Sequence, residues 1–153
     1  MASSVPAALD YLVAQIATLP QAQPPVVVSD GWPAQRGDDG IVIGINPEGD
    51  ETGIAGAYAE LSGQEYEEVE VPCILWSHRS GTNAASAARV AAFTLFDAVR
   101  ALVKSDRRFG GAIRPGMPAR VSTWSVAQTS AATQAGEGRV CEIRFVVTWQ
   151  HRG

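Results

Sequence analysis

Apolar side chains recur at two different spacings along the chain, and these spacings predict two helices and five strands. In residues 5–18 they follow one another by three or four positions, which is the spacing of one helix face. Ser4 and Pro6 suit the start of that helix. A longer helix is predicted from Thr82 or Asn83 to about Ser105, because alanines and large apolar residues share one arc. Alternating or β-branched runs predict strands at 26–29, 41–45, 67–76, 120–129 and 139–150.

These elements predict an α+β fold with a mixed, mainly antiparallel β-sheet. The long central helix and the N-terminal helix are expected to pack on the sheet. The last two strands are separated by a polar loop that contains glycine, which favours an antiparallel hairpin. There is no internal repeat and no linker composition, so a single domain over residues 1–153 is expected.

The strand at 67–76 has two different faces. Val69, Val71, Cys73 and Leu75 form an apolar face, while the other face begins with acids and ends apolar at Trp76. We therefore expect the strand to start at the solvent-exposed rim of the domain and to run into its interior. Pro72 predicts an edge or bulge position, because proline has no N–H to give to a ladder. Cys73 and Cys141 lie in apolar runs and are expected to be reduced core residues.

Residues 46–64 form a long segment with four glycines, one proline and no sustained periodicity. We expect a loop, and a long loop in a compact domain is often functional. Ile54, Tyr58 and Leu61 are spaced by four and three positions, so they are expected to form a short apolar stripe when the loop is ordered. The stripe is interpreted as a docking element for a partner; the alternative is that it folds back on its own domain.

Charge is divided along the chain more sharply than the net value of −4 indicates. Between Arg36 and Arg79 there are ten carboxylates and no lysine or arginine, whereas from Arg79 onward eleven basic residues face four acids. Such a division suits a head-to-tail contact between identical subunits, which closes into a ring or continues as a filament. The alternative is two solvated surfaces that never meet.

The proposed contact places a basic helix face against an acidic strand edge. Arg89 and Arg100 lie on the polar arc of the long helix with Phe93 between them, and Glu67, Glu68 and Glu70 are the candidate acidic residues of the neighbour. An aromatic residue among charges is either covered by its own chain, by the N-terminal helix or the long loop, or kept for a partner.

Chemistry is sparse in this sequence. His78 and Ser80 share a turn, yet no nucleophile elbow surrounds the serine, so the turn is interpreted as structural. The acidic run 48–53 lacks the spacing of a calcium loop, and no Cys or His pair has ligand spacing. No catalytic residue, cofactor or metal is expected. The pI of about 5.1 argues against nucleic-acid binding as the main task, and no segment has the length of a membrane span.

The element order resembles that of the tail-terminator proteins of long-tailed bacteriophages. The resemblance rests on a strand ending in Trp76, a polar turn, an Ala/Arg-rich helix containing Phe96-Asp97-Ala98-Val99, then Gly110-Gly111 and a closing hairpin. It implies a small α+β domain without catalytic residues that forms a six-membered ring on the tail tube. Such a ring stops tube polymerisation and provides a docking surface for the head connector.

The resemblance therefore implies a virion protein of the tail–head junction, assembled in the host cytoplasm. Its expected partners are further copies of itself, the tail tube protein and the head–tail connector protein, with no membrane and no specific nucleic-acid binding. Two other hypotheses stay open at this point. One is a head–tail adaptor or head-closure ring, and the other is a small cytoplasmic enzyme or ligand-binding domain that uses the turn around His78.

Overall fold

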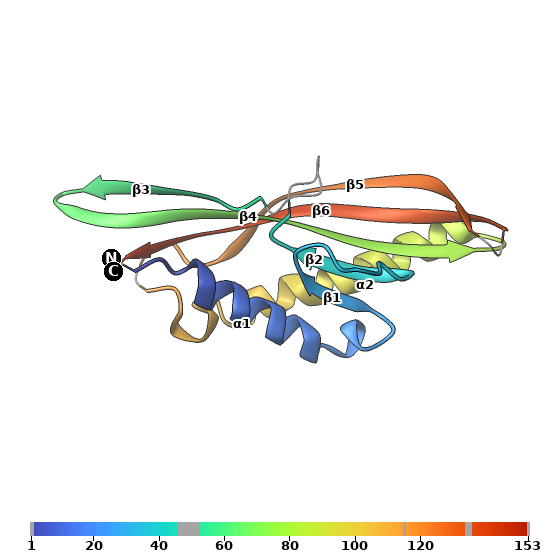
Figure 1. Cartoon of the computed structure of the whole chain (residues 1–153), viewed down its shortest axis with the longest axis horizontal. Helices are drawn as coiled ribbons and strands as arrows, with labels where there is room; N and C mark the ends of the chain where they lie inside the picture. Colours follow the sequence, from blue (N-terminus) through green and yellow to red (C-terminus); the bar gives the residue numbers. More distant parts are fainter. Residues whose placement is uncertain (1, 46–52, 115, 134–135, 153) are drawn as a thin grey trace.

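The computed structural model describes residues 2–45, 53–114, 116–133 and 136–152, without the side chains of residues 131–137. In these residues two helices, α1 (Val5–Thr18) and α2 (Ala84–Ser105), lie on one face of a six-stranded sheet (Figure 1). The strands are β1 (Val27–Asp30), β2 (Asp39–Ile43), β3 (Ala55–Leu61), β4 (Gln64–Ser80), β5 (Arg120–Thr133) and β6 (Gly136–Arg152). Short 3₁₀ turns, η1 (Pro20–Ala22) and η2 (Phe109–Gly111), follow the two helices. The predicted α+β class is confirmed.

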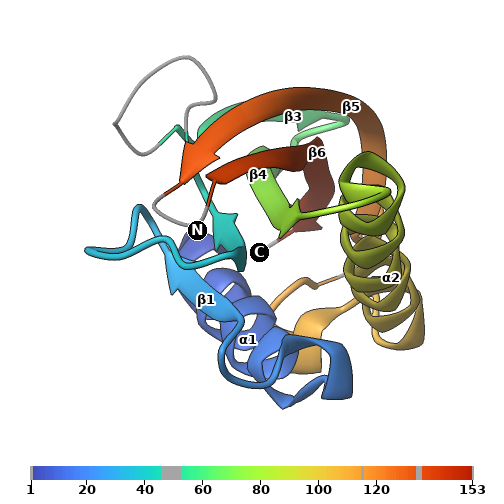
Figure 2. The ribbon, with the colours of Figure 1, turned by 90° about the vertical axis from the view of Figure 1, so that its right-hand side faces the viewer.

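The strand order is β1-β2-β4-β6-β5, and β3 pairs with β4 on the same side as β2. Among the described strands β1 and β2 are parallel, and the other neighbouring pairs are antiparallel. Seen along the strands, the sheet is strongly twisted, and β5 curves down beside α2 (Figure 2). The sheet is therefore mixed but mainly antiparallel, as the sequence predicts.

The main core lies between the helices and the sheet. Helix α1 contributes Leu12 and Ile16, while α2 contributes Phe96 and Val99, all of them buried. The facing sheet residues are the alternate positions of two central strands: Val69, Val71, Cys73 and Leu75 of β4, and Cys141, Ile143, Phe145, Val147 and Trp149 of β6. Burial of this apolar area is the main source of stability. Both cysteines are buried and free, as predicted.

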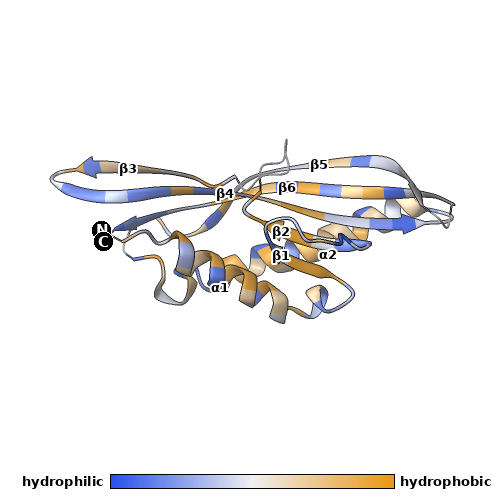
Figure 3. Cartoon of the chain, viewed as in Figure 1, coloured by the Kyte–Doolittle hydropathy of each residue, from blue (hydrophilic) through white to orange (hydrophobic). Residues whose placement is uncertain are grey.

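A second, smaller cluster lies on the opposite face of the sheet, which we call the outer face. Val42, Ile45, Ile74 and Trp76 form it, with Trp32 and Val140 packed against them. The Trp76 ring covers Gly40 so closely that a Cβ there would come within 2.4 Å of the indole. On the outer face Ile74 and Trp76 of β4 are therefore covered, whereas Glu68 and Glu70 nearer its start are exposed; Figure 3 colours that start hydrophilic.

Strand β4 is central, so the edge position predicted from Pro72 is wrong. On one side β4 pairs with β6 along most of its length, and on the other it pairs first with β3 and then with β2. Pro72 falls between the last β3 partner, Glu70, and the first β2 partner, Cys73. Its missing N–H is tolerated at this gap, where its carbonyl accepts bonds from Gly44 and Ile45 at 2.9 and 3.0 Å.

The predicted long loop is largely a β-hairpin. Residues 46–52 lie outside the described part of the chain, and Ala55–Leu61 is strand β3. Ser62 and Gly63 make the turn to β4 with φ of 54° and 76°, as in the primed turns that hairpins favour. Pairing with β4 overrides the weak strand preference of the alanines and glycine in this segment. Figure 1 shows this hairpin reaching beyond the helices at one end of the molecule.

The apolar stripe predicted within the loop is therefore wrong. Ile54 is partly buried against the core of its own chain. Tyr58 lies opposite Glu67, while Leu61 lies opposite Gln64, so these two side chains point to different faces of the strand. Both are exposed, at 60% and 59%. A spacing of three that unites residues on a helix separates them on a strand.

Candidate subunit interface

The side of α2 that faces β5 carries the three residues predicted for the basic side of an interface. Arg89 donates from Nη1 to Gln128 Oε1 at 2.8 Å, and Gln128 in turn donates to the carbonyl of Ala85. Arg100 lies 3.5 Å from Asp97 and holds its guanidinium 5.8 Å from the Phe96 ring centre. Both arginines are exposed. The sequence thus placed Arg89, Phe93 and Arg100 on a common side, and that side flanks an edge strand.

Phe93 is half-buried and covered by its own chain. Its ring meets Trp124 of β5 edge-to-face at 5.6 Å and Phe96 at 6.2 Å. The covering element is β5, not the N-terminal helix or the long loop named from the sequence. Around this contact the surface stays apolar, because Val90, Trp124 and Val126 are 62%, 53% and 43% exposed. Such a cluster of exposed apolar residues is typical of an interaction surface.

Glu67 is not available to a neighbour, which corrects its assignment to an acidic edge. It lies on the helix face, 4% exposed, at the start of α1. Its carboxylate accepts the Ser3 hydroxyl at 2.5 Å, the Ser4 N–H at 2.8 Å and the Ser4 hydroxyl at 3.0 Å. Burial alone would raise the pKa of Glu67, but the bonds from Ser3 and Ser4 and the nearby His151 outweigh it and lower the pKa. Glu67 is buried because of its position in the alternation of the strand, and the acidic composition of the segment does not indicate this.

Glu68 and Glu70 are exposed as expected, but they point to the outer face. Glu68 accepts a bond from Gln150 Nε2 of β6 at 3.0 Å. Helix α2 and its arginines lie on the other face of the sheet. A partner that reaches Glu68 and Glu70 therefore approaches from the side opposite to the helices.

Within the described residues three strands, β1, β3 and β5, have an unpaired edge, and the edges of β3 and β5 lie on opposite sides of the sheet. Among the described residues β3 pairs only with β4, on the side away from β6, and β5 pairs only with β6, on the side away from β4. Strand β5 carries no charged residue after Arg120, and β3 carries only Glu60. Strand β5 has a register shift, a β-bulge, between Val121 and Thr123. An open edge is a template on which another chain can add a strand, and natural sheets limit this with lysine, proline, charge or a bulge; here β3 has Glu60 and β5 has the bulge.

A small pocket with a cationic rim lies where α2 ends and β5 begins. We call it the cationic pocket; its volume is about 80 Å³, and it is lined by Arg100, Val103, Lys104, Arg107, Ala119, Arg120 and Val121. The floor, Val103 and Ala119, is buried, while the four basic residues are exposed. Within the described chain no carboxylate lies within 4 Å of the side-chain nitrogens of Lys104, Arg107 or Arg120. The sequence interpretation missed this site, although Arg100, Lys104 and Arg107 have the spacing of one helix side.

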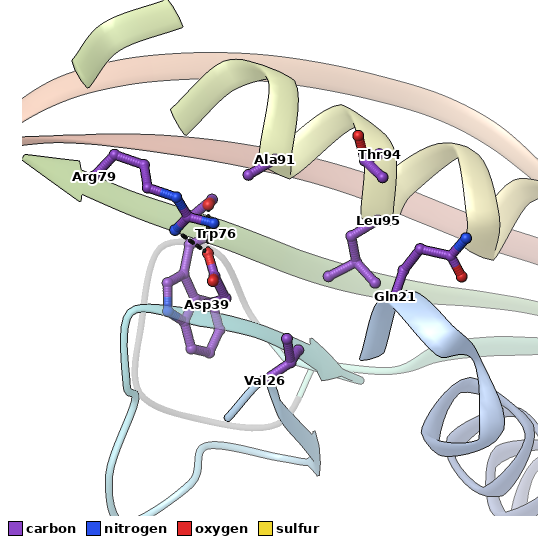
Figure 4. Close-up of a pocket in the computed structure, with 9 residues that line it drawn as sticks. Gln21, Val26, Asp39, Trp76, Arg79, Ala91, Thr94 and Leu95 are labelled. Carbon is purple, nitrogen blue, oxygen red and sulfur yellow. Dashed lines mark hydrogen bonds and ion pairs between the residues drawn. The ribbon is translucent and has the colours of Figure 1, made fainter. Parts of the chain in front are cut away.

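A cleft between η1, β2, β4 and α2 is one candidate small-molecule site (Figure 4). Its volume is about 220 Å³, below the range usual for ligand sites. Its charged residues are already paired, since Arg79 Nη1 lies 2.8 Å from Asp39 Oδ1, which also accepts the Ser77 hydroxyl. The lining offers no histidine or cysteine as a catalytic base or nucleophile.

The turn around His78 is part of the strand, not a separate loop. His78 and Ser80 both belong to the last residues of β4, and His78 Nδ1 lies 3.3 Å from Asp38. In the described part of the chain no three His, Cys, Asp or Glu side chains form a group that could hold a metal ion. Neither described helix is long and apolar enough to cross a membrane.

Comparison with known proteins adds no family to this picture. No protein-family model matches the chain, and no curated protein matches it.

Proposed function

We propose that this chain is a structural protein that assembles head to tail into a ring, and that the ring is the tail terminator of a long-tailed bacteriophage. The ring would sit on the end of the tail tube, stop its polymerisation and present a surface to the head connector. The resemblance in element order supports the tail, and the surface of the molecule supports the ring.

The pair of open, nearly uncharged strand edges is the observation that carries the proposal. Because β3 and β5 lie on opposite sides of one sheet, the edge of one copy meets a different edge of the next. A contact between two different surfaces is heterologous, and repeated copies then close into a ring when the rotation allows it. Backbone hydrogen bonds supply affinity in such strand additions.

The distribution of charge supports the same arrangement. Exposed carboxylates of Glu60, Glu65, Glu68 and Glu70 gather on the β3–β4 hairpin, whereas arginines and a lysine border β5 and the end of α2. Opposite potentials on the two contacting surfaces favour one register and suppress contacts of like with like.

The mass of the purified chain in solution tests the ring. Light scattering and native mass spectrometry at micromolar concentration are expected to give one closed species of six subunits, with rings visible by negative-stain electron microscopy. A monomer at every concentration would contradict the proposal.

Tube growth tests the terminator role. Ring added to polymerising tail tube protein of the same phage is expected to bind tube ends and shorten the tubes. A ring that leaves tube length unchanged but binds the head connector would instead be a head-side adaptor.

A further inference from the structure

The tip of the β3–β4 hairpin holds two carboxylates side by side. Glu60 and Glu65 are directly opposite each other in the ladder, so their side chains share one face. Both are exposed, and neither has an ion-pair partner within the described residues. Arg152 of the adjacent strand places its guanidinium over the Tyr66 ring, 6.0 Å from its centre. Like charges opposite each other are unfavourable in the free chain, so this pair favours a cationic partner.

The cationic pocket has the opposite charge imbalance, an excess of positive charge. Arg100 and Lys104 lie one turn apart on α2, Arg107 follows in the turn after the helix, and Arg120 adds a fourth positive charge from the first residue of β5. Asp97 lies near Arg100 alone. Four cations around a small apolar floor repel one another until an anionic group is placed between them.

We propose that the Glu60–Glu65 pair of one copy docks on the cationic pocket of the next copy, with β3 of the first copy adding antiparallel to β5 of the second. This inference rests on the ring of the proposed function and names the contact that would hold it together.

The direction of the strands agrees with this docking. Strand β3 runs toward the hairpin tip, and β5 runs away from Arg120, which borders the pocket. With the tip at the pocket the two strands are antiparallel, as the described pairs of this sheet other than β1 and β2 are.

The faces of the sheet agree as well. Glu60 and Glu65 have the same alternation as Tyr58 and Glu67, and Glu67 is buried on the helix face. The pocket is formed by α2, which lies on that same face. When the sheet of one copy continues into the next with the helices on one side, the carboxylates and the cations therefore meet without a change of face.

Charge reversal of each partner tests the contact. The tip variant Glu60→Lys/Glu65→Lys and the pocket variant Lys104→Glu/Arg107→Glu/Arg120→Glu, which leaves the pocket net acidic, are each expected to raise the dissociation constant of the ring by roughly a hundredfold or more, because like charges then face each other. Each variant should keep the circular dichroism and the thermal unfolding transition of the wild-type monomer. An equimolar mixture is expected to restore the ring, because each pocket then receives a tip of opposite charge.

The matched control is Glu68→Lys/Glu70→Lys. It changes the same charge in the same hairpin on the outer face, and the ring is expected to persist. If the tip variant or the pocket variant assembles as the wild type does, or if their mixture stays monomeric, this docking is wrong while the ring itself can stand. A monomeric wild-type chain would defeat both proposals.

A cationic pocket could also bind the phosphate groups of DNA, and binding to a double-stranded DNA oligonucleotide tests this alternative. The wild-type chain and the pocket variant are expected to bind this DNA equally weakly or not at all. Loss of DNA binding by a pocket variant that still forms rings would assign the pocket to phosphate groups and overturn the docking.

Discussion

At the scale of single residues, buried polar groups tie the ends of this chain to its centre. Glu67 joins β4 to the start of α1, and the Trp149 indole donates to the Ser4 hydroxyl at 2.8 Å. Asp106, directly after α2, plays a similar part for the middle of α1. It accepts bonds from the Gly110 N–H and the Tyr11 hydroxyl, each at 2.8 Å, and these lower its pKa. Charged hydrogen-bond partners of this kind fix where a helix starts on the sheet.

Replacing Glu67 by glutamine is expected to lower the free energy of unfolding by about 1–3 kcal/mol, since a single amide oxygen replaces two acceptors for three donors. The pKa of Glu67 is held below its ordinary value, so its contribution is complete above about pH 4.3 and is lost as pH falls through the lower folded pKa. Urea unfolding across this pH range measures both effects. Glu68→Gln, at the exposed neighbouring position, should change stability by no more than about 0.5 kcal/mol.

The two cysteines are expected to react with a thiol reagent only after denaturation. Both have 0% exposure, and burial raises the pKa of Cys73 to about 12 and also raises that of Cys141. The thiolate that reacts is therefore almost absent at neutral pH. Absorbance of a released chromophoric thiol, followed with and without denaturant, measures this. Rapid labelling of the native chain would contradict the core described between the helices and the sheet.

At the scale of elements, an aromatic cluster fastens α2 to the sheet. Phe93, Phe96, Trp124 and Phe145 form a chain of ring contacts from the helix to β5 and β6. The cluster explains why an aromatic residue occupies the polar arc of α2. The edge strand curves toward the helix, so the arc that is buried is wider than helical periodicity alone predicts.

Phe93→Ala is expected to destabilise the folded chain by about 1–3 kcal/mol, because a half-buried ring and two aromatic contacts are lost. The mass of the oligomeric ring should stay the same, since the phenyl side chain of Phe93 packs within its own chain. Val90→Ala, one turn away and mostly exposed, is the control and should change stability little. A Phe93→Ala variant with unchanged stability and a dissociated ring would return Phe93 to the interface.

At the scale of the whole molecule, acidic and basic surfaces are separated in space as well as in sequence. Four exposed acids, Glu60, Glu65, Glu68 and Glu70, gather on the projecting hairpin, and a group of basic residues, Arg100, Lys104, Arg107 and Arg120, borders the start of β5 and the end of α2. In the proposed ring, opposite charges at the contact are expected to contribute to assembly.

Ring assembly is therefore expected to weaken as salt is added. Raising the ionic strength from 0.1 M to 1 M shortens the screening length from about 10 Å to about 3 Å. The dissociation constant measured by light scattering should rise across this range, and the association rate should fall more steeply. The Glu60→Lys/Glu65→Lys variant should lose most of this dependence. A ring whose affinity is the same at both ionic strengths would show that charge contributes little to it.

The sequence by itself determined both helices, the fold class, the core cysteines and the separation of charge. The ends of α1 and α2 fall at or near the predicted residues, because Ser4, Pro6 and an unbroken apolar arc are local signals. Five of the six described strands overlap a predicted one, and β4, β5 and β6 contain it in full. Alternation along each strand is also local, so the apolar faces of β4 and β6 were predictable.

Only the tertiary structure decided which exposed groups can meet a partner. Strand β3 has weak strand propensity and forms because β4 offers it a ladder, which no pattern within Ala55–Leu61 indicates. Glu67 and Glu68 are neighbours of the same chemistry, yet the pleat buries one and exposes the other. The cationic pocket joins Arg107 to Arg120 across a turn, so it exists only once α2 and β5 are packed together. Local interactions fix elements from the sequence, whereas surfaces arise from contacts between residues far apart along the chain.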